Sequence, residues 1–177
     1  RWRLSETLDR VAPETFRGVL DVMSTEPGMT YAQSQFPLYE EMERNQPHLF
    51  ARIQEEIRRG AWIVVGGKYV ESDSMLPGGE ALIRQFLVGQ RYAREKLGVG
   101  TVELAWVPDC FAGHVHTTPM IYAGCGIRYY VFNRGCPEEL RAFYWESPDG
   151  TGLFSYKIPK HYNLTIDEEL APVDSEW

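Results

Sequence analysis

Residues 79–107 read GEALIRQFLVGQRYAREKLGVGTVELAWV, and no other stretch says more about the fold class. Apolar residues at helical spacing predict a helix over 79–97, with an inward face made of Leu82, Ile83, Phe86, Leu87 and Ala93. Residues 102–107 form a short apolar run, which is typical of a buried strand. A helix followed directly by a buried strand predicts a unit of a parallel α/β fold.

The flanking sequence repeats this alternation. Upstream, one helical face runs on both sides of Pro13, which suits a helix start or a kink. A further helix is predicted to begin at Pro47 and to end at Gly60. The remaining predicted elements are strands at 29–33 and 61–65 (extended by Tyr69 and Val70), a helix at 119–125, and strands at 127–132, 142–145 and 153–158. The order predicts a parallel α/β architecture. Periodicity alone does not distinguish an open sheet from a barrel.

Composition narrows the classes of function. The chain has 177 residues and a net charge of −7, and such acidity disfavours a nucleic-acid partner. No run of about 18 apolar residues predicts a membrane span, and the start of the chain does not resemble a signal peptide. Three cysteines without a CxxC spacing favour a reducing, cytoplasmic location over a disulfide framework. The 13% aromatic content suits a core or a sugar-binding surface, and the acidic segment 167–177 reads as an exposed linker.

Polar residues follow several predicted strands, at the edge where parallel α/β folds place their active groups. Asp109 comes directly after the strand ending at Val107, where it is either catalytic or the cap of the next helix. Glu71 and Asp73 are two residues apart, so on a strand they point the same way, and a cation or polar ligand would relieve their repulsion. The alternative is a solvated turn. Gln35 follows the first predicted strand.

Cys110 and two histidines lie close to Asp109 in the sequence. His114 and His116 form an H-x-H pair, whose spacing suits one metal ion. The pair has no third partner in the sequence nearby, so it is a weak indication of a metal site.

Four blocks occur in an order that resembles glycoside hydrolase family 38, the α-mannosidases, and its bacterial and cytosolic type above all. The first is S-Q-x-x-x-Y-E from Ser34, and the second is G-G-x-[WY]-V-E-x-D from Gly66. The third is G-E-x-L-[IV]-R-Q-x-L-x-G-Q-R from Gly79, and the fourth is W-x-P-D-x-F from Trp106. The resemblance covers residues 1–158.

The resemblance implies part of a seven-stranded β/α barrel with parallel strands alternating with helices. Residues 1–177 would form a partial catalytic domain whose first strand and downstream part lie outside the chain. It also implies zinc-dependent, retaining hydrolysis of terminal α-mannosides, with mannosides or mannose-containing oligosaccharides as substrates. Exposed barrel helices often serve as interfaces, which leaves a homo-oligomer open.

For individual residues, the resemblance implies that Asp109 is both the nucleophile and a ligand of a single Zn²⁺ ion. It places Glu71, Asp73, Trp106 and Phe111 among the substrate-binding residues. The family's His-x-Asp zinc pair, general acid and last zinc histidine fall outside these 177 residues, so we expect the isolated chain to be inactive.

Two alternatives remain beside this interpretation. The first is an enzyme with a related barrel, such as a polysaccharide deacetylase or a family 57 glycosidase, although the Asp-Asp and His-x-x-x-His motif of the deacetylases is absent from the sequence. The second is a carbohydrate-binding fragment without catalysis, which an incomplete zinc set would suit.

Overall fold

The computed structural model describes residues 6–111, 113–136 and 140–159, so the acidic segment 167–177 lies outside the described residues. The elements follow in the order η1 (Thr7–Val11, a π-helical turn), α2 (Ala12–Thr25), β1 (Tyr31–Gln33), α3 (Phe36–Asn45), α4 (Pro47–Arg59), β2 (Trp62–Val64), α5 (Gly79–Lys96), β3 (Leu104–Val107), α6 (Thr118–Gly124), β4 (Tyr129–Phe132), β5 (Ala142–Glu146) and β6 (Gly152–Lys157). The expected alternation of strands and helices is confirmed.

The strands form two sheets, and neighbouring strands are mostly parallel. β1 pairs with β2 in parallel, and the second sheet has the order β3-β4-β6-β5 with β5 alone antiparallel. A single backbone hydrogen bond of 2.8 Å, from Gly66 N to Leu104 O, links the chain just after β2 to β3. The α/β class is therefore confirmed, whereas the six strands of the described residues do not show a seven-stranded barrel.

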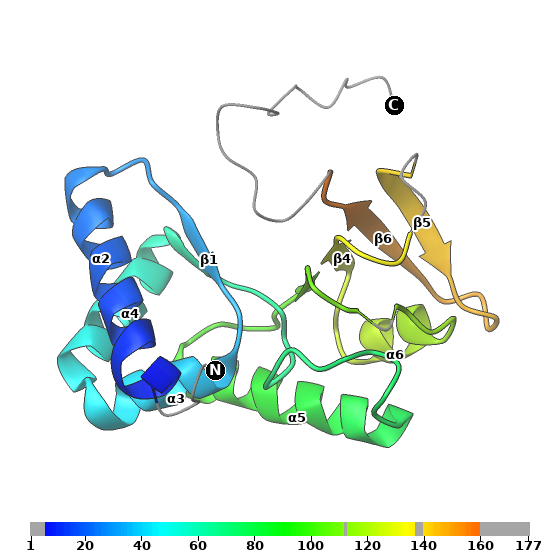
Figure 1. Ribbon diagram of the computed structural model, residues 1–177, viewed down its shortest axis with the longest axis horizontal. Coiled ribbons are helices and arrows are strands. Elements are labelled where there is room, and N and C mark those ends of the chain that lie inside the picture. The colour runs from blue at the N-terminus through cyan, green and yellow to red at the C-terminus, as the bar shows by residue number, and fades with distance from the viewer. Residues whose placement is uncertain (1–5, 112, 137–139, 160–177) are drawn as a thin grey trace.

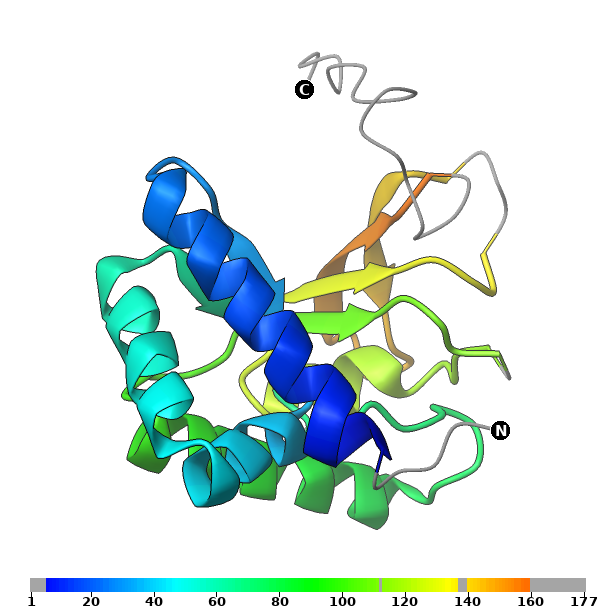
Figure 2. The same cartoon turned by 60° about the vertical axis from the view of Figure 1, so that its left-hand side comes forward.

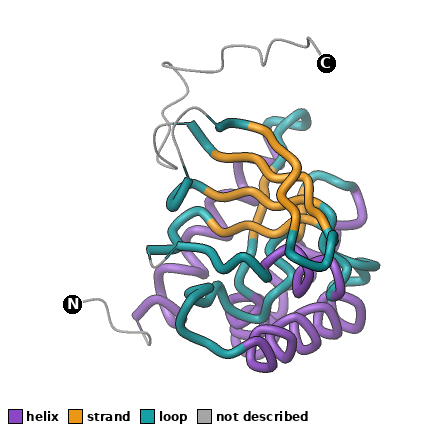
Figure 3. The backbone as a smooth tube through the Cα atoms, turned by 90° about the vertical axis from the view of Figure 1, so that its right-hand side faces the viewer, coloured by secondary structure: helices purple, strands orange, loops and turns teal. Residues whose placement is uncertain are grey.

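In the tube view, helices lie below the strands and beside them (Figure 3). α2 and α4 lie together to the left of β1, and α5 runs below both sheets (Figure 1). Turning the molecule brings α2 to the front, where it crosses close to β1 (Figure 2). Between these elements, Phe16 packs edge-on against Trp62 at 5.3 Å between ring centroids, and the Trp62 indole N–H donates to the Tyr39 hydroxyl at 2.8 Å. The resulting apolar core holds the helices against β1 and β2.

α4 begins and ends where the sequence predicts. Pro47 occupies the first turn, where its missing N–H has no helical partner to lose. Gly60 ends the helix with φ 79°, a left-handed conformation that glycine adopts without steric cost. α3 was not predicted: it is strongly charged, and only Phe36, Tyr39 and Met42 are buried.

Two expectations about α5 and the strand before it are wrong. Leu82, Phe86 and Ala93 face inward, but Ile83 is 40% exposed and Leu87 is 63% exposed. Each lies one residue, or about 100° of helical turn, beyond an inward-facing neighbour, so both point away from the sheets. The predicted extension of β2 by Tyr69 and Val70 also fails, because Gly66 and Gly67 adopt φ of 93° and 76° and turn the chain out of the strand direction.

That turn brings the chain down onto α5. Tyr69 N donates to the Gln85 backbone oxygen at 2.9 Å, and Val70 N donates to the Gln85 side chain at 3.0 Å. Gly89 allows the approach, since a Cβ there would lie 2.3 Å from the Gly67 oxygen. The segment leading to Glu71 is therefore held by the helix beneath it.

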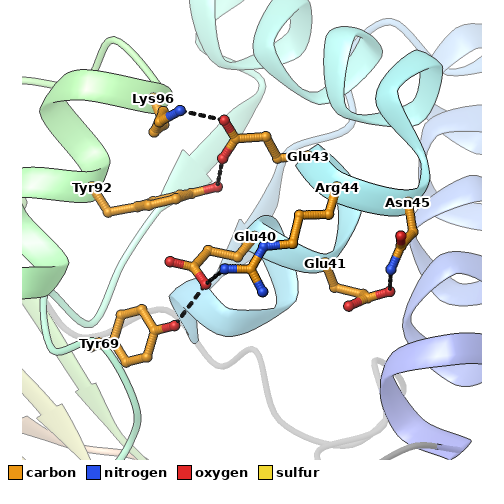
Figure 4. A network of polar contacts seen from close by, with 8 residues as sticks. All are labelled: Glu40, Glu41, Glu43, Arg44, Asn45, Tyr69, Tyr92 and Lys96. Atoms are coloured by element: carbon orange, nitrogen blue, oxygen red, sulfur yellow. Dashed lines mark hydrogen bonds and ion pairs between the residues drawn. The ribbon is translucent and has the colours of Figure 1, made fainter.

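Polar contacts tie α3 to the same helix and to the same segment (Figure 4). Tyr69 donates to Glu40 at 2.9 Å, and Tyr92 donates to Glu43 at 3.1 Å. Lys96 completes the group as an ion-pair partner of Glu43. These contacts hold α3 in place against α5, and thereby also position Gln35, which directly precedes α3.

In the described residues, Cys110 and Cys125 are free thiols. Among the helices described, none combines the length and the apolar character that a membrane crossing requires.

Candidate functional site

A pocket of about 260 Å³ lies where three parallel strands end. Its walls are formed by Gln35, Glu71, Ser72, Asp73, Asp109, Cys110 and Phe111. Gln35 follows β1, Glu71 to Asp73 follow β2, and Asp109 to Phe111 follow β3. The strand-end rule thus brings together residues that are up to 76 positions apart in the chain.

Gln35 has an unusual backbone conformation for its residue type. Its φ is 70° and its ψ is 81°, and among the described residues it is the one non-glycine with positive φ. This conformation costs free energy in a residue with a Cβ. It lets the side-chain oxygen accept the Glu71 backbone N–H at 3.1 Å, while its side-chain nitrogen lies 3.4 Å from the Glu71 carboxylate.

Glu71 is half-buried between other ionisable groups. Burial raises the pKa of its carboxyl, and the nearby Asp109 carboxylate acts in the same direction. A backbone hydrogen bond from Asp109 and the charge of Lys68 oppose that shift. Burial reduces the hydration of this carboxyl group, and a like charge lies nearby. A cation or a sugar hydroxyl would relieve both effects, so such a group binds either partner well.

Asp73 lines the pocket but is also part of a turn. One of its oxygens accepts the backbone N–H of Met75 at 2.8 Å and that of Leu76 at 3.3 Å. This is the arrangement of an Asx turn. Of the two sequence alternatives for Asp73, the turn is present in the structure, and its role as a site residue stays a prediction.

Lys68 and its neighbour Ser72 were missed by sequence reasoning. Lys68 is 3% exposed, and its ammonium donates to the Ser72 backbone oxygen at 3.1 Å and to the Ser72 hydroxyl at 3.3 Å. Burial lowers the pKa of Lys68, and Glu71 is first among the charges that oppose this. The buried ammonium thus stabilises the position of Ser72 in the pocket wall. Its signal in the sequence was weak, because a lysine in a glycine-rich turn usually faces solvent.

Asp109 is held by a residue from the next strand. The Arg134 Nε donates to the Asp109 Oδ1 at 2.6 Å, and both side chains are about one third exposed. The Arg134 guanidinium also lies over the Phe111 ring, 4.3 Å from its centroid. Arg134 follows β4 by two residues, so applying the strand-end rule to that strand too would have found it.

Trp106 lies away from the pocket, whereas Cys110 lines it beside Asp109. Trp106 lies on β3 between the buried Ala105 and Val107, so it points to the other face of the sheet and does not line the pocket. The buried Cys110 thiol lies 3.0 Å from the Gly113 carbonyl oxygen.

His114 and His116 do not converge on one point. His114 is enclosed by aromatic rings, and both of its ring nitrogens have hydrogen-bond partners within the protein. His116 is exposed, and its backbone oxygen accepts from Ser147 at 3.0 Å. Nor do the described residues contain a cluster of three His, Cys, Asp or Glu side chains that could hold a metal ion. The part of the chain that the structure describes therefore does not supply a complete set of zinc ligands.

A mostly parallel α/β fold with carboxylates gathered at its strand ends defines a class of enzyme scaffold. Within that class, residues 1–174 match the model of the glycosyl hydrolases family 38 N-terminal domain. The chain belongs to this family.

Individual relatives agree with this assignment. The chain is 36% identical over 163 residues to the human protein alpha-mannosidase 2C1, in a match that covers 89% of the chain but 15% of that protein. It is 31% identical over 172 residues to alpha-mannosidase G of Dictyostelium discoideum, with 94% of the chain and 16% of that protein covered. The chain thus spans less than a fifth of the length of these relatives.

A solved structure has the same fold. The crystal structure of an alpha-mannosidase from Enterococcus faecalis V583 superimposes with a TM-score of 0.81 at 22% identity, covering 91% of this chain and 19% of that one. At this level of identity the likeness shows the fold, while the family rests on the sequence match.

Proposed function

We propose that this chain is the part of a larger α-mannosidase that carries the catalytic nucleophile, Asp109. The reaction is the retaining hydrolysis of terminal α-mannosides through a covalent glycosyl-aspartate. The observation that carries the proposal is that Asp109 and Glu71 line one strand-end pocket and that Arg134 is hydrogen-bonded to Asp109, in a chain of family 38.

In the first half of the reaction, an Asp109 carboxylate oxygen attacks the anomeric carbon and the bond from that carbon to the leaving oxygen breaks. The leaving oxygen takes a proton from a general acid that lies outside this chain. In the second half, water attacks the same carbon, loses a proton to that group and releases Asp109. Retention follows because two displacements occur at one carbon.

Arg134, which bonds Asp109, and the other residues that line the pocket orient the reactants. Arg134 fixes the Asp109 carboxylate through its hydrogen bond, so that the nucleophile does not have to be ordered at each turnover. Glu71, Asp73 and Phe111 line the same pocket as Asp109, which supports a role for them in contacting sugar hydroxyls and C–H groups. Trp106 belongs to this substrate-binding set only if the sugar reaches the other face of β3.

The proposal includes one Zn²⁺ ion, with Asp109 as one ligand and the others supplied from outside this chain. A pocket with three carboxylates suits a cation electrostatically, although the described residues do not complete its coordination. The relatives with mannosidase names, the free thiols of Cys110 and Cys125 and the acidic charge together suit a cytoplasmic enzyme acting on mannosides.

The test is the variant Asp109→Asn in the full-length protein, with Asp149→Asn in the exposed turn before β6 as the matched control. We expect Asp109→Asn to abolish turnover of an aryl α-mannoside and Asp149→Asn to leave it unchanged. A fluorinated mannosyl fluoride, which traps glycosyl-enzymes, should label the peptide that contains Asp109 in the unmodified protein. Full turnover by Asp109→Asn, or a label on another carboxylate, would contradict the assignment.

A non-catalytic carbohydrate-binding role is the second candidate, because the described residues do not complete a metal site. Calorimetric titration with a mannoside separates the two. If the full-length protein binds mannoside but has no turnover in the presence of Zn²⁺, the binding role is correct.

A further inference from the structure

The two histidines of the H-x-H pair have different surroundings, and His114 lies in the contact chain that leads to the candidate nucleophile. Its Nε2 is 2.8 Å from the Arg134 backbone oxygen, and the Arg134 side chain bonds Asp109 at 2.6 Å. On its other side, its Nδ1 is 2.9 Å from the hydroxyl of Tyr130. One imidazole therefore connects a residue in β4 with the loop that follows β4.

The partners define which nitrogen of His114 carries the proton. A backbone carbonyl can only accept, so Nε2 must be the protonated nitrogen. Burial lowers the pKa of His114, which favours the neutral ring. Nδ1 then has a lone pair, and the Tyr130 hydroxyl donates to it. Tyr130 is 0% exposed, so this bond also satisfies a hydroxyl that water does not reach.

The imidazole has little room to rotate. Its ring lies edge-on to Phe132, at 4.9 Å between centroids, and to Trp145, at 6.0 Å. Gly135 packs against it as well, since a Cβ at that position would lie 3.2 Å from the His114 Cδ2 atom. Gly135 has a φ of 81°, a conformation that brings the backbone of the Arg134 loop onto the ring.

We propose that His114 is a positioning residue for the nucleophile: it ties the Arg134 backbone to Tyr130 and thereby sets the place from which the guanidinium reaches Asp109. The effect of His114 on catalysis rests on the proposed function. Its effect on the position of the Arg134 guanidinium does not. His114 is not among the residues that line the pocket, and its effect passes through Arg134.

The variant that tests this is His114→Phe in the full-length protein, because phenylalanine keeps an aromatic ring among Phe132 and Trp145 but makes neither hydrogen bond. The matched control is His116→Phe, the same change at an exposed histidine two residues away. Tyr130→Phe removes only the bond to Nδ1 and serves as the milder variant. His114→Gln restores a donor to the Arg134 carbonyl and serves as the rescue.

In crystal structures, we expect the Arg134–Asp109 hydrogen bond to be broken in His114→Phe and kept in His116→Phe. This readout does not depend on activity, so it stays informative even if the full-length protein hydrolyses no mannoside. An unbroken Arg134–Asp109 bond in His114→Phe would overturn the proposal. If His114→Phe does not fold, the same comparison is made with Tyr130→Phe, in which we expect the bond to lengthen.

In kinetics with an aryl α-mannoside, we expect kcat of His114→Phe to fall between about tenfold and 100-fold with KM unchanged, since small displacements of catalytic groups cost that much. His114→Gln should recover part of this loss. In an Arg134→Gln background, adding His114→Phe should have no further effect, because the two residues act in series. Equal, multiplicative effects in both backgrounds would show that His114 does not act through Arg134.

Discussion

Arg134 reaches back across 25 residues of chain to hold Asp109, with 2.6 Å between its Nε and the Asp109 Oδ1. The contact joins the loop after β4 to the loop after β3, two neighbouring parallel strands with Trp106 opposite Val131. Because both strands end at the same edge of the sheet, residues that follow them meet there.

Replacing Arg134 with Gln in the full-length protein should lower kcat/KM for an aryl α-mannoside about 30-fold, because a hydrogen bond to a charged group contributes about 2 kcal/mol. Arg128→Gln is the control, since Arg128 forms an exposed ion pair with Glu103 at 3.6 Å. Steady-state kinetics of both variants check the prediction. An Arg134→Gln enzyme with native kcat/KM would show that the contact has no catalytic role.

Gly89→Ala should destabilise the fold. The new Cβ would lie 2.3 Å from the Gly67 oxygen and 2.8 Å from the Phe36 ring, so backbone would have to move. We expect a loss of about 2 kcal/mol in the free energy of unfolding, as for other overpacked cores. Urea denaturation measures it.

Gly18→Ala is the matched control for that variant. Gly18 lies inside α2, and a Cβ added there would meet no atom within 4 Å, so the change adds only helix propensity. We expect a gain of about 0.5–1 kcal/mol. A similar effect at both glycines would contradict the close approach of α5 to the Gly67 turn.

The stability of the protein should depend on the protonation of His114. Burial lowers the pKa of His114 in the folded state, so below the ordinary histidine pKa of about 6.5 the unfolded chain binds the proton more readily. Stability from this group is therefore complete above that pH and is lost as the pH falls. We expect the urea midpoint to drop less between pH 7.5 and 5.5 in His114→Phe than in the unmodified protein, and by the unmodified amount in His116→Phe. An unchanged drop in His114→Phe would mean that the folded state accepts the proton.

The isolated 177-residue chain should not hydrolyse an aryl α-mannoside, with or without added Zn²⁺. Asp109 is the single family zinc ligand that the resemblance places within it, and the described residues hold no group of three ligands. The full-length protein should be active and lose its activity with a chelator. Turnover by the isolated chain above the rate of an Asp109→Asn chain would show that these residues suffice for catalysis.

Local patterns predicted most of the secondary structure and the pocket that it forms. Pro47 and Gly60 mark the two ends of α4 because each acts through its own backbone constraint, independently of the rest of the fold. Glu71, Asp73 and Asp109 could be expected together because parallel strands bring their carboxyl ends to one edge. Ile83 and Leu87 were misassigned because apolar spacing does not say how wide the covered stripe of a helix is.

The sequence pattern alone was enough to predict the α/β class, the family and a strand-end position for Asp109, since each depends on residues close together along the chain. The hydrogen bond of Arg134 to Asp109, the neutral His114 between Tyr130 and Arg134, and the buried Lys68 behind Ser72 all depend on contacts between separate segments. Such contacts follow from how helices and strands pack, and no local spacing encodes them. The sequence therefore identifies the candidate residues of the site, whereas the tertiary structure determines how they are arranged.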